Sequence, residues 1–348
     1  MIVVALVSCL LFSLAITPFV IKFAVKIGAV DQPDFNRKVH QKVMPRIGGI
    51  AIYLSFLVGI MIIRPDNELL IPILIGSLVI ILTGLLDDLF QLTPKIKLVG
   101  QSLAAAIVIL GGIQVEFINL PFGGVLEFGV LSIPITVLWI IGITNAINFI
   151  DGLDGLSAGV SLIGIMTIGF MSLLMGDMFV LSISVILCGS ILGFLPYNFY
   201  PAKIFMGDTG ALFLGFMIAV VSLLGFKNVT VISLIIPVII LGVPISDTLF
   251  AIIRRKVNRQ PISAPDRSHL HHCLLNLGYT HKQTVIVIYA ISTLFGLIAI
   301  IFSQATIWGG IILIGVVILA IELFVESIGL IGKEYRPILK LIGGEKDK

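Results

Sequence analysis

Charged residues are scarce in this chain: Asp, Glu, Lys and Arg together make up 12% of its 348 residues. Soluble domains carry about 25%. Hydrophobic residues instead make up 58% of the chain. This composition excludes a soluble protein and predicts one embedded in a lipid bilayer, so we expect the bilayer as a partner and no nucleic acid.

Cysteines are few, and they form no pattern. Cys9, Cys188 and Cys273 stand alone and far apart, which excludes a disulfide framework and a structural zinc motif. The chain also lacks a visible internal repeat, and this weighs against a transporter built from inverted repeats. It lacks a long hydrophilic stretch as well, so we expect a single integral membrane domain over residues 1–348.

Apolar stretches long enough to span a bilayer, about 20 residues each, are abundant. They predict an all-α polytopic membrane protein with eleven transmembrane helices. The last two helices come from one apolar run, 283–321, which we divide at Ser303 and Gln304. The expected spans are 2–22, 47–64, 70–87, 97–113, 132–148, 156–175, 179–196, 210–226, 230–253, 284–302 and 306–324.

Basic residues are nearly absent from one side of the predicted membrane. If the N-terminus lies outside, all but two of the 22 Lys and Arg residues, Arg64 and Lys227, fall on the inner side. All five histidines fall there too. This bias predicts a cytoplasmic C-terminus. The outer segment 114–129 alternates around a Gly-Gly pair, which predicts a small extracytoplasmic β-hairpin.

Two adjacent carboxylates, Asp87 and Asp88, end the third span. The carboxyl end of a helix already carries partial negative charge, so this pair requires a cation. Mg²⁺ could supply it, as could Lys95 and Lys97 nearby. The alternative is a solvated loop that merely ends the helix.

A second polar group begins near the end of the fifth span and continues beyond it at steps of three residues: Asn145, Asn148, Asp151 and Asp154. Neighbouring pairs at this spacing share one face of a helix. The glycines that follow the aspartates predict that the helix unwinds, so that the polar side chains line a cavity. The alternative is an asparagine-capped turn.

Asp208 opens the eighth span within the segment FMGDTGA. A carboxylate beside a glycine turn suits a Mg²⁺ ion that bridges phosphate oxygens. The alternative is that Asp208 simply caps its helix.

A histidine-rich loop follows the ninth span. Its imidazoles and its arginine suit contact with a diphosphate, with the arginine as a bidentate clamp. A zinc site and a solvated loop are the alternatives. The four loop residues are Arg267, His269, His271 and His272.

Three further acidic residues are less clearly placed. For Asp247 the sequence leaves an active-site role and a structural role equally open. Glu322 and Glu326 are expected at the membrane interface.

The chain contains five motifs that, in their order along the sequence, resemble those of the polyprenyl-phosphate N-acetylhexosamine-1-phosphate transferases. The match runs through most of the chain. The histidine loop is similar to that of the WecA/TagO branch. The MraY branch has a run of adjacent histidines followed by an acidic residue, and this run is absent here. The motifs are PRIGG at 45–49, LDDLFQLTPKIKLVGQ at 86–101, NAINFIDGLDGLSAG at 145–159, YNFYPAKIFMGDTGALFLG at 197–215 and PDRSHLHHCLLNLG at 265–278.

The resemblance implies a bacterial plasma-membrane (inner-membrane) enzyme. It would transfer GlcNAc-1-phosphate from UDP-GlcNAc to undecaprenyl phosphate, giving undecaprenyl-diphospho-GlcNAc and UMP. This step initiates a cell-envelope glycopolymer such as teichoic acid or O-antigen. The resemblance also implies Mg²⁺ as cofactor, with Mn²⁺ as the alternative, and a homodimer. The active site would lie on cytoplasmic loops at about 25–46, 87–97, 145–156, 196–210 and 254–283.

Residue roles are carried over by motif position. Asp208 resembles the family's magnesium ligand, and Asp88 is the second expected ligand. Phe205 matches a uracil-stacking aromatic, and Asp87 is the candidate that positions or deprotonates the lipid phosphate. The other expected catalytic residues are Asp151 and Asp154, and the other expected substrate-binding residues are Asn145, Asn148, Asn198, Lys97, Arg267, His269, His271 and His272.

Two other functions remain open at this point. One is the same chemistry with another donor, such as UDP-MurNAc-pentapeptide in an MraY-like enzyme. The other is an ion-coupled transporter, which would place its acids near the middle of the bilayer rather than at the inner ends of its spans. Within the transferase mechanism, we expect direct attack of the lipid phosphate, with a covalent aspartyl-phosphate on Asp87 or Asp88 as the alternative.

Overall fold

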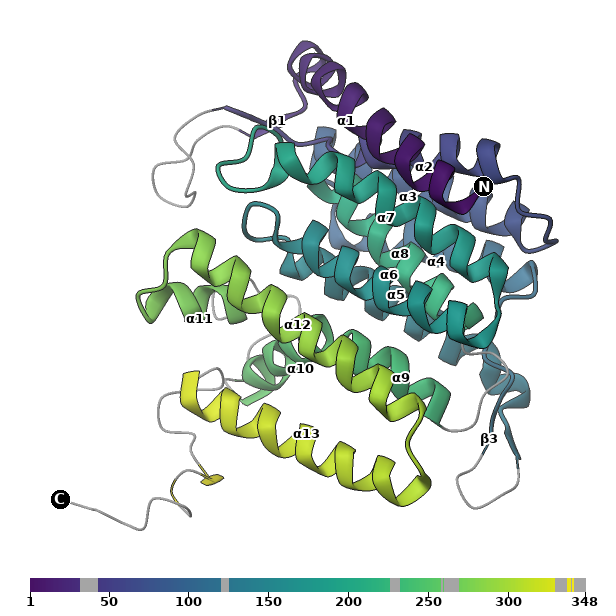
Figure 1. Ribbon diagram of the computed structural model, residues 1–348. Helices are drawn as coiled ribbons and strands as arrows, with labels where there is room; N and C mark the ends of the chain where they lie inside the picture. The colour runs from purple at the N-terminus through teal and green to yellow at the C-terminus, as the bar shows by residue number, and fades with distance from the viewer. Residues whose placement is uncertain are drawn as a thin grey trace.

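The computed structural model describes residues 1–31, 43–119, 125–225, 232–257, 259, 269–328, 337–338 and 340 of the chain. The protein is a bundle of helices with two very small sheets (Figure 1). The helices are α1 (Ile2–Ile27), α2 (Gly49–Ile63), α3 (Leu70–Phe90), α4 (Pro94–Leu110), η1 (Gly129–Leu131), α5 (Ser132–Ile150), α6 (Leu156–Met175), α7 (Met178–Asn198), α8 (Gly207–Gly225), α9 (Ile232–Ile240), α10 (Gly242–Val257), α11 (Leu270–Asn276), α12 (His281–Ser303) and α13 (Ile307–Ile328).

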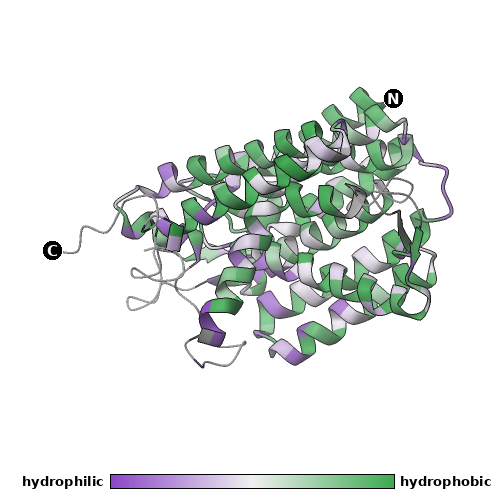
Figure 2. Ribbon diagram, turned by 90° about the horizontal axis from the view of Figure 1, so that it is seen from below, coloured by the Kyte–Doolittle hydropathy of each residue, from purple (hydrophilic) through white to green (hydrophobic). Residues whose placement is uncertain are grey.

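The all-α polytopic membrane fold is confirmed. Among the described residues, eight helices are long and apolar enough to cross a membrane: α1, α3, α5, α6, α7, α8, α12 and α13. Helix α2 is apolar but has 15 residues, and α4 has 17. The count of eleven spans therefore stays a prediction. Figure 2 shows hydrophobic residues along most of the helices, with hydrophilic ones gathered near the helix ends and in a small central group.

Helix α8 lies at the centre of the bundle. All of its residues except Asp208 are buried, whereas only 22% of the α1 span and 17% of the α13 span are buried. Close contacts with its neighbours depend on small residues. A Cβ atom on Gly84 of α3 would come within 2.6 Å of the Asp208 carbonyl oxygen, and one on Gly49 of α2 would come within 2.2 Å of the Gly210 nitrogen. Small residues let helices in a membrane approach closely, and here they hold the start of α8 against α2 and α3.

The structure divides the segment expected as one span at 230–253 into two helices, α9 and α10, so this span stays a prediction. The division has two causes, one in the segment itself and one in a neighbouring helix. Pro244 has no backbone N–H and cannot continue the hydrogen-bond ladder across the break. Gly242, at the same place, packs so close to Phe295 that a Cβ atom would lie 2.7 Å from its ring.

The predicted hairpin is confirmed. Strands β3 (Phe117–Asn119) and β4 (Val125–Glu127) pair antiparallel, with Phe117 opposite Glu127, and the Gly-Gly tip lies outside the described residues. A second antiparallel ladder joins β1 (Val30–Asp31) to β2 (Met44–Pro45). The sequence analysis did not predict this ladder, which positions the segment leading into α2.

Candidate active site

The start of α8 is fixed by backbone hydrogen bonds to the segment before α2. The Phe205 N–H donates to the Pro45 carbonyl (2.8 Å), the Gly48 N–H to the Phe205 carbonyl (3.0 Å), and the Gly49 N–H to the Met206 carbonyl (2.9 Å). The motifs at 45–49 and 197–215 are therefore paired in space, about 160 residues apart in the chain.

Asp88 caps α8 from the end of α3. Its carboxylate accepts hydrogen bonds from the backbone N–H groups of Asp208 (3.0 Å) and Thr209 (2.9 Å) and from the Thr209 hydroxyl (2.6 Å). Arg46 lies 3.6 Å from the same carboxylate. A carboxylate at a helix N-terminus meets the positive end of the helix dipole. Since Asp88 caps α8, the alternative in which Asp208 merely caps its own helix is contradicted.

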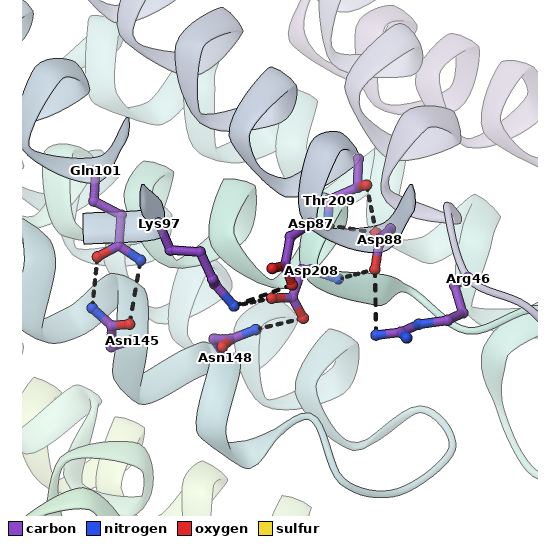
Figure 3. A network of polar contacts seen from close by, with 9 residues as sticks. All are labelled: Arg46, Asp87, Asp88, Lys97, Gln101, Asn145, Asn148, Asp208 and Thr209. Atoms are coloured by element: carbon purple, nitrogen blue, oxygen red, sulfur yellow. Dashed lines mark hydrogen bonds and ion pairs between the residues drawn. The ribbon is translucent and has the colours of Figure 1, made fainter. Parts of the chain in front are cut away.

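Asp208, freed from capping, joins a second group with Asp87, Lys97 and Asn148 (Figure 3). The Lys97 ammonium contacts the Asp208 carboxylate and lies 3.4 Å from Asp87 Oδ2. The Asn148 amide donates to Asp208 Oδ1 at 3.2 Å. Asp87 and Asp88 are only 9% and 6% exposed, so the alternative of a solvated loop is also contradicted.

Asn145 lies one turn before Asn148 and faces α4. It exchanges two hydrogen bonds with Gln101, at 2.8 and 3.2 Å, and donates a third to the Ile141 carbonyl at 2.8 Å. Its amide is therefore engaged within the protein (Figure 3). This arrangement favours a role in holding α4 and its Lys97 against α5, and the predicted substrate contact of Asn145 stays a prediction.

Asp151 ends α5 beside this cluster. Burial raises the pKa of Asp151 to about 8, and the nearby carboxylates of Asp208 and Asp88 act in the same direction. The Asp151 carboxyl group is thus largely protonated at neutral pH unless a cation joins the site. A group with such a pKa can hold or release a proton near pH 7.

Asp154 belongs to a neighbouring cluster. Its carboxylate accepts the Ala202 N–H at 2.9 Å, and its own N–H donates to His281 Nε2 at 3.0 Å. Asn198 donates to the Ile204 carbonyl at 3.0 Å within the same turn. Both predicted residues thus hold the turn that carries Phe205, whose side chain is partly exposed.

The histidine loop reaches the same region. His271 packs so closely against Gly152 that a Cβ on the glycine would lie 2.3 Å from His271 Nε2. Burial lowers the pKa of His271 to about 3, with His272 acting in the same direction, so this imidazole is neutral at physiological pH. His269 and His271 are buried, which contradicts a solvated loop. Arg267 lies outside the described residues.

The oxygen atoms of the Asp208 group fit a magnesium ion. In the described part of the chain, no group of three or more His, Cys, Asp and Glu side chains could hold a metal by itself. Mg²⁺ is usually bound by one or two carboxylates together with substrate phosphates and water. Asp208 and Asp87 offer such a pair and already share the Lys97 cation. Both Asp88 oxygens accept hydrogen bonds, which favours positioning over its predicted ligand role.

Three residues of this site were missed by the sequence analysis: Arg46, Gln101 and Thr209. Arg46 lies in the motif at 45–49, Thr209 adjoins Gly210 in the motif at 197–215, and Gln101 ends the motif at 86–101. A polar residue within or next to an apolar span was the available signal. Their partners could not be named because each contact joins segments far apart in the chain.

Comparisons with known proteins identify the family of this chain. Residues 70–226 match the family model described as "Glycosyl transferase family 4". The chain is 50% identical over 342 residues to the Bacillus subtilis (strain 168) protein named "Probable undecaprenyl-phosphate N-acetylglucosaminyl 1-phosphate transferase", covering 97% of this chain and 95% of that protein.

Two more distant relatives carry related names. One is a "Decaprenyl-phosphate N-acetylglucosaminephosphotransferase" of Mycolicibacterium smegmatis, 35% identical over 306 residues, with 78% of this chain and 75% of that protein covered. The other is an "Undecaprenyl-phosphate alpha-N-acetylglucosaminyl 1-phosphate transferase" of Thermotoga maritima, 32% identical over 291 residues, with 83% and 87% covered.

Proposed function

This chain belongs to the family of polyprenyl-phosphate N-acetylhexosamine-1-phosphate transferases, and we propose that it transfers GlcNAc-1-phosphate from UDP-GlcNAc to undecaprenyl phosphate. The products are undecaprenyl-diphospho-GlcNAc and UMP. The observation that carries the proposal is the pair of carboxylates, Asp87 and Asp208, that shares the Lys97 cation at the end of a membrane-embedded bundle. The name of the 50% identical relative supports the same donor and acceptor.

The reaction exchanges one phosphoanhydride for another. An oxygen of the lipid phosphate forms a bond to the sugar-bearing phosphorus of UDP-GlcNAc. The bond from that phosphorus to the bridging oxygen breaks, and UMP leaves with the bridging oxygen and its electron pair. Because two anions must meet, catalysis depends mainly on neutralising charge and holding the reactants in line.

The residues of the site suit this task. Lys97 is the cation nearest the two carboxylates, and its ammonium can turn toward a substrate phosphate. Asn148 orients Asp208, and Asp88 holds the helix start that carries it. Mg²⁺, when bound by Asp208 with Asp87, would supply the additional positive charge that diphosphate chemistry requires.

Direct attack is the pathway that these contacts support. A lipid phosphate is already ionised near pH 7, so it needs positioning more than deprotonation. Both carboxylate oxygens of Asp88 accept hydrogen bonds from the start of α8, which leaves them poorly placed to attack phosphorus, and Asp87 is paired with Lys97. An aspartyl-phosphate intermediate would have to disrupt one of these arrangements.

Several finer features belong to the same proposal. The distribution of Lys and Arg supports an active site that faces the cytoplasm, where UDP-sugars are available. We also propose that the product begins a cell-envelope glycopolymer, and that the protein is a homodimer, as its family resemblance implies.

Purified protein tests the proposal directly. Detergent-solubilised protein is mixed with undecaprenyl phosphate, Mg²⁺ and radiolabelled UDP-GlcNAc, and label is followed into the organic phase while UMP is measured in the aqueous phase. UDP-MurNAc-pentapeptide serves as a parallel donor. Transfer from UDP-GlcNAc that stops with EDTA is the expected result. Transfer only from the pentapeptide donor would assign the MraY-like reaction instead.

A further inference from the structure

A buried pair of side chains, a carboxylate and an imidazole, lies just outside the site described so far. Asp247 of α10 is 2% exposed, and its Oδ2 atom lies 2.7 Å from Nδ1 of His269. Its other oxygen accepts the backbone N–H of Leu270, also at 2.7 Å. Both carboxylate oxygens are therefore engaged by two successive residues of the histidine loop.

The carboxylate fixes the beginning of α11. Leu270 is the first residue of that helix, and His269, the residue before it, makes no side-chain cap. The first N–H groups of a helix need a partner from outside, and here Asp247 provides one from another helix. The segment that bears the histidines is thereby anchored to α10.

The surroundings of Asp247 strengthen this anchor. On another side the residue faces a cavity of about 420 Å³ between α10, α12 and α13, whose lining is apolar apart from Asp247 and Ser246. A buried carboxylate in such surroundings depends on its hydrogen-bond partners, because water is not available to replace them. His269 and Leu270 are these partners.

The His269 ring in turn lies against the catalytic region. Its centroid is 6.3 Å from that of Phe149, the residue that follows Asn148 on α5. It is parallel to the His271 ring at 6.0 Å, and His271 contacts Gly152 beside Asp151. His269 thus lies between Asp247 and the end of α5 that carries the acid cluster.

We propose that Asp247 is a positioning residue for the transferase: it accepts the Nδ1–H of His269 and holds the ring so that an Nε2–H can donate to the substrate diphosphate. The hydrogen bond made by one imidazole nitrogen decides which nitrogen carries the proton and how the ring is oriented. The inference rests on the proposed function for its substrate, and it favours an active-site role for Asp247 over a purely structural one.

Kinetics of four proteins test this role: wild type, Asp247→Asn, His269→Gln and the double variant. Asparagine keeps the size of the side chain but not the carboxylate, so kcat should fall on the order of 10- to 100-fold. If Asp247 acts through His269, its loss should cost little in the His269→Gln background. Losses that multiply in the double variant, or wild-type kcat in Asp247→Asn, would overturn the proposal.

A matched control separates this role from general helix capping. Asp177 also caps a helix, accepting the N–H groups of Phe179 and Val180 at 3.1 and 3.0 Å, at the start of α7. Asp177→Asn should leave kcat unchanged. If Asp247→Asn does not fold, Asp247→Glu replaces it in the same four-protein comparison. The longer acid keeps the negative charge but moves the carboxylate, and therefore displaces the His269 imidazole.

A measurement without turnover separates this inference from the proposed function. Protein labelled with ¹⁵N-histidine is examined by nuclear magnetic resonance, and the signal absent from His269→Gln identifies His269. In wild type we expect Nδ1 to be protonated, and Asp247→Asn should shift this signal. An Nδ1 signal unchanged by Asp247→Asn refutes the positioning role, whichever donor the enzyme uses. Inactive wild-type protein with the expected signal would instead count only against the function.

Discussion

Replacing Gly207 by alanine should damage the site far more than its small size suggests. Gly207 has a φ of +70°, and a Cβ atom there would lie 1.7 Å from the Arg46 carbonyl oxygen and 2.5 Å from Asp88 Oδ2. The left-handed conformation alone costs about 1–2 kcal/mol for a residue with a Cβ atom. The collision with a backbone oxygen cannot be relieved by rotating a side chain.

Relief requires the start of α8 to move by more than 1 Å, since Cβ contacts under 3.0 Å are essentially never seen. That movement breaks the three backbone hydrogen bonds between the 45–49 and 205–206 segments. At about 1 kcal/mol each, their loss raises the total cost to about 4–5 kcal/mol. Asp208 moves with the helix, and a 1 Å displacement at a reacting centre can cost about 100-fold in rate.

Gly176 provides the matched control. It has a φ of +76°, but a Cβ atom there would have no atom within 4 Å, so Gly176→Ala should cost only the backbone strain. Thermal unfolding in detergent and transfer of label from UDP-GlcNAc are measured for both variants. The reasoning is refuted if Gly207→Ala unfolds at the same temperature as Gly176→Ala and keeps wild-type transfer.

Three further predictions concern the acid cluster. Lys97→Met should lower turnover on the order of 100-fold or more, because the carboxylates of Asp87 and Asp208 lose their shared cation. Lys95 is exposed on the same helix, so the control Lys95→Met should leave turnover near that of wild type. Asp208→Asn should abolish transfer in folded protein, and activity retained by the purified variant would contradict the magnesium assignment. Because the folded state raises the pKa of Asp151 from 3.8 to about 8, the folded protein holds a proton that the unfolded chain has released, and stability should fall as pH rises through that window. Asp151→Asn in EDTA should lessen this decline. Melting temperatures that fall equally with pH in variant and wild type would contradict the prediction.

The membrane-spanning elements could be predicted because their causes are local. An apolar helix in a bilayer satisfies its own backbone hydrogen bonds, so its existence depends on one continuous segment. The expected span at 284–302, for example, lies within α12. The exception is 230–253, where Pro244 and the packing of Gly242 against Phe295 divide the segment. The proline was visible in the sequence, but its consequence was decided by the neighbouring helix.

The sequence by itself determined which side chains could carry the chemistry and that most of them lie at the ends of spans. Only the tertiary structure decided what each one contacts. Asp87 and Asp88 are neighbours in the chain, yet successive residues of a helix point about 100° apart. Asp87 therefore meets Lys97, while Asp88 caps α8 from 120 residues away. Such pairings follow from how the helices pack against one another, which no local pattern of residues specifies.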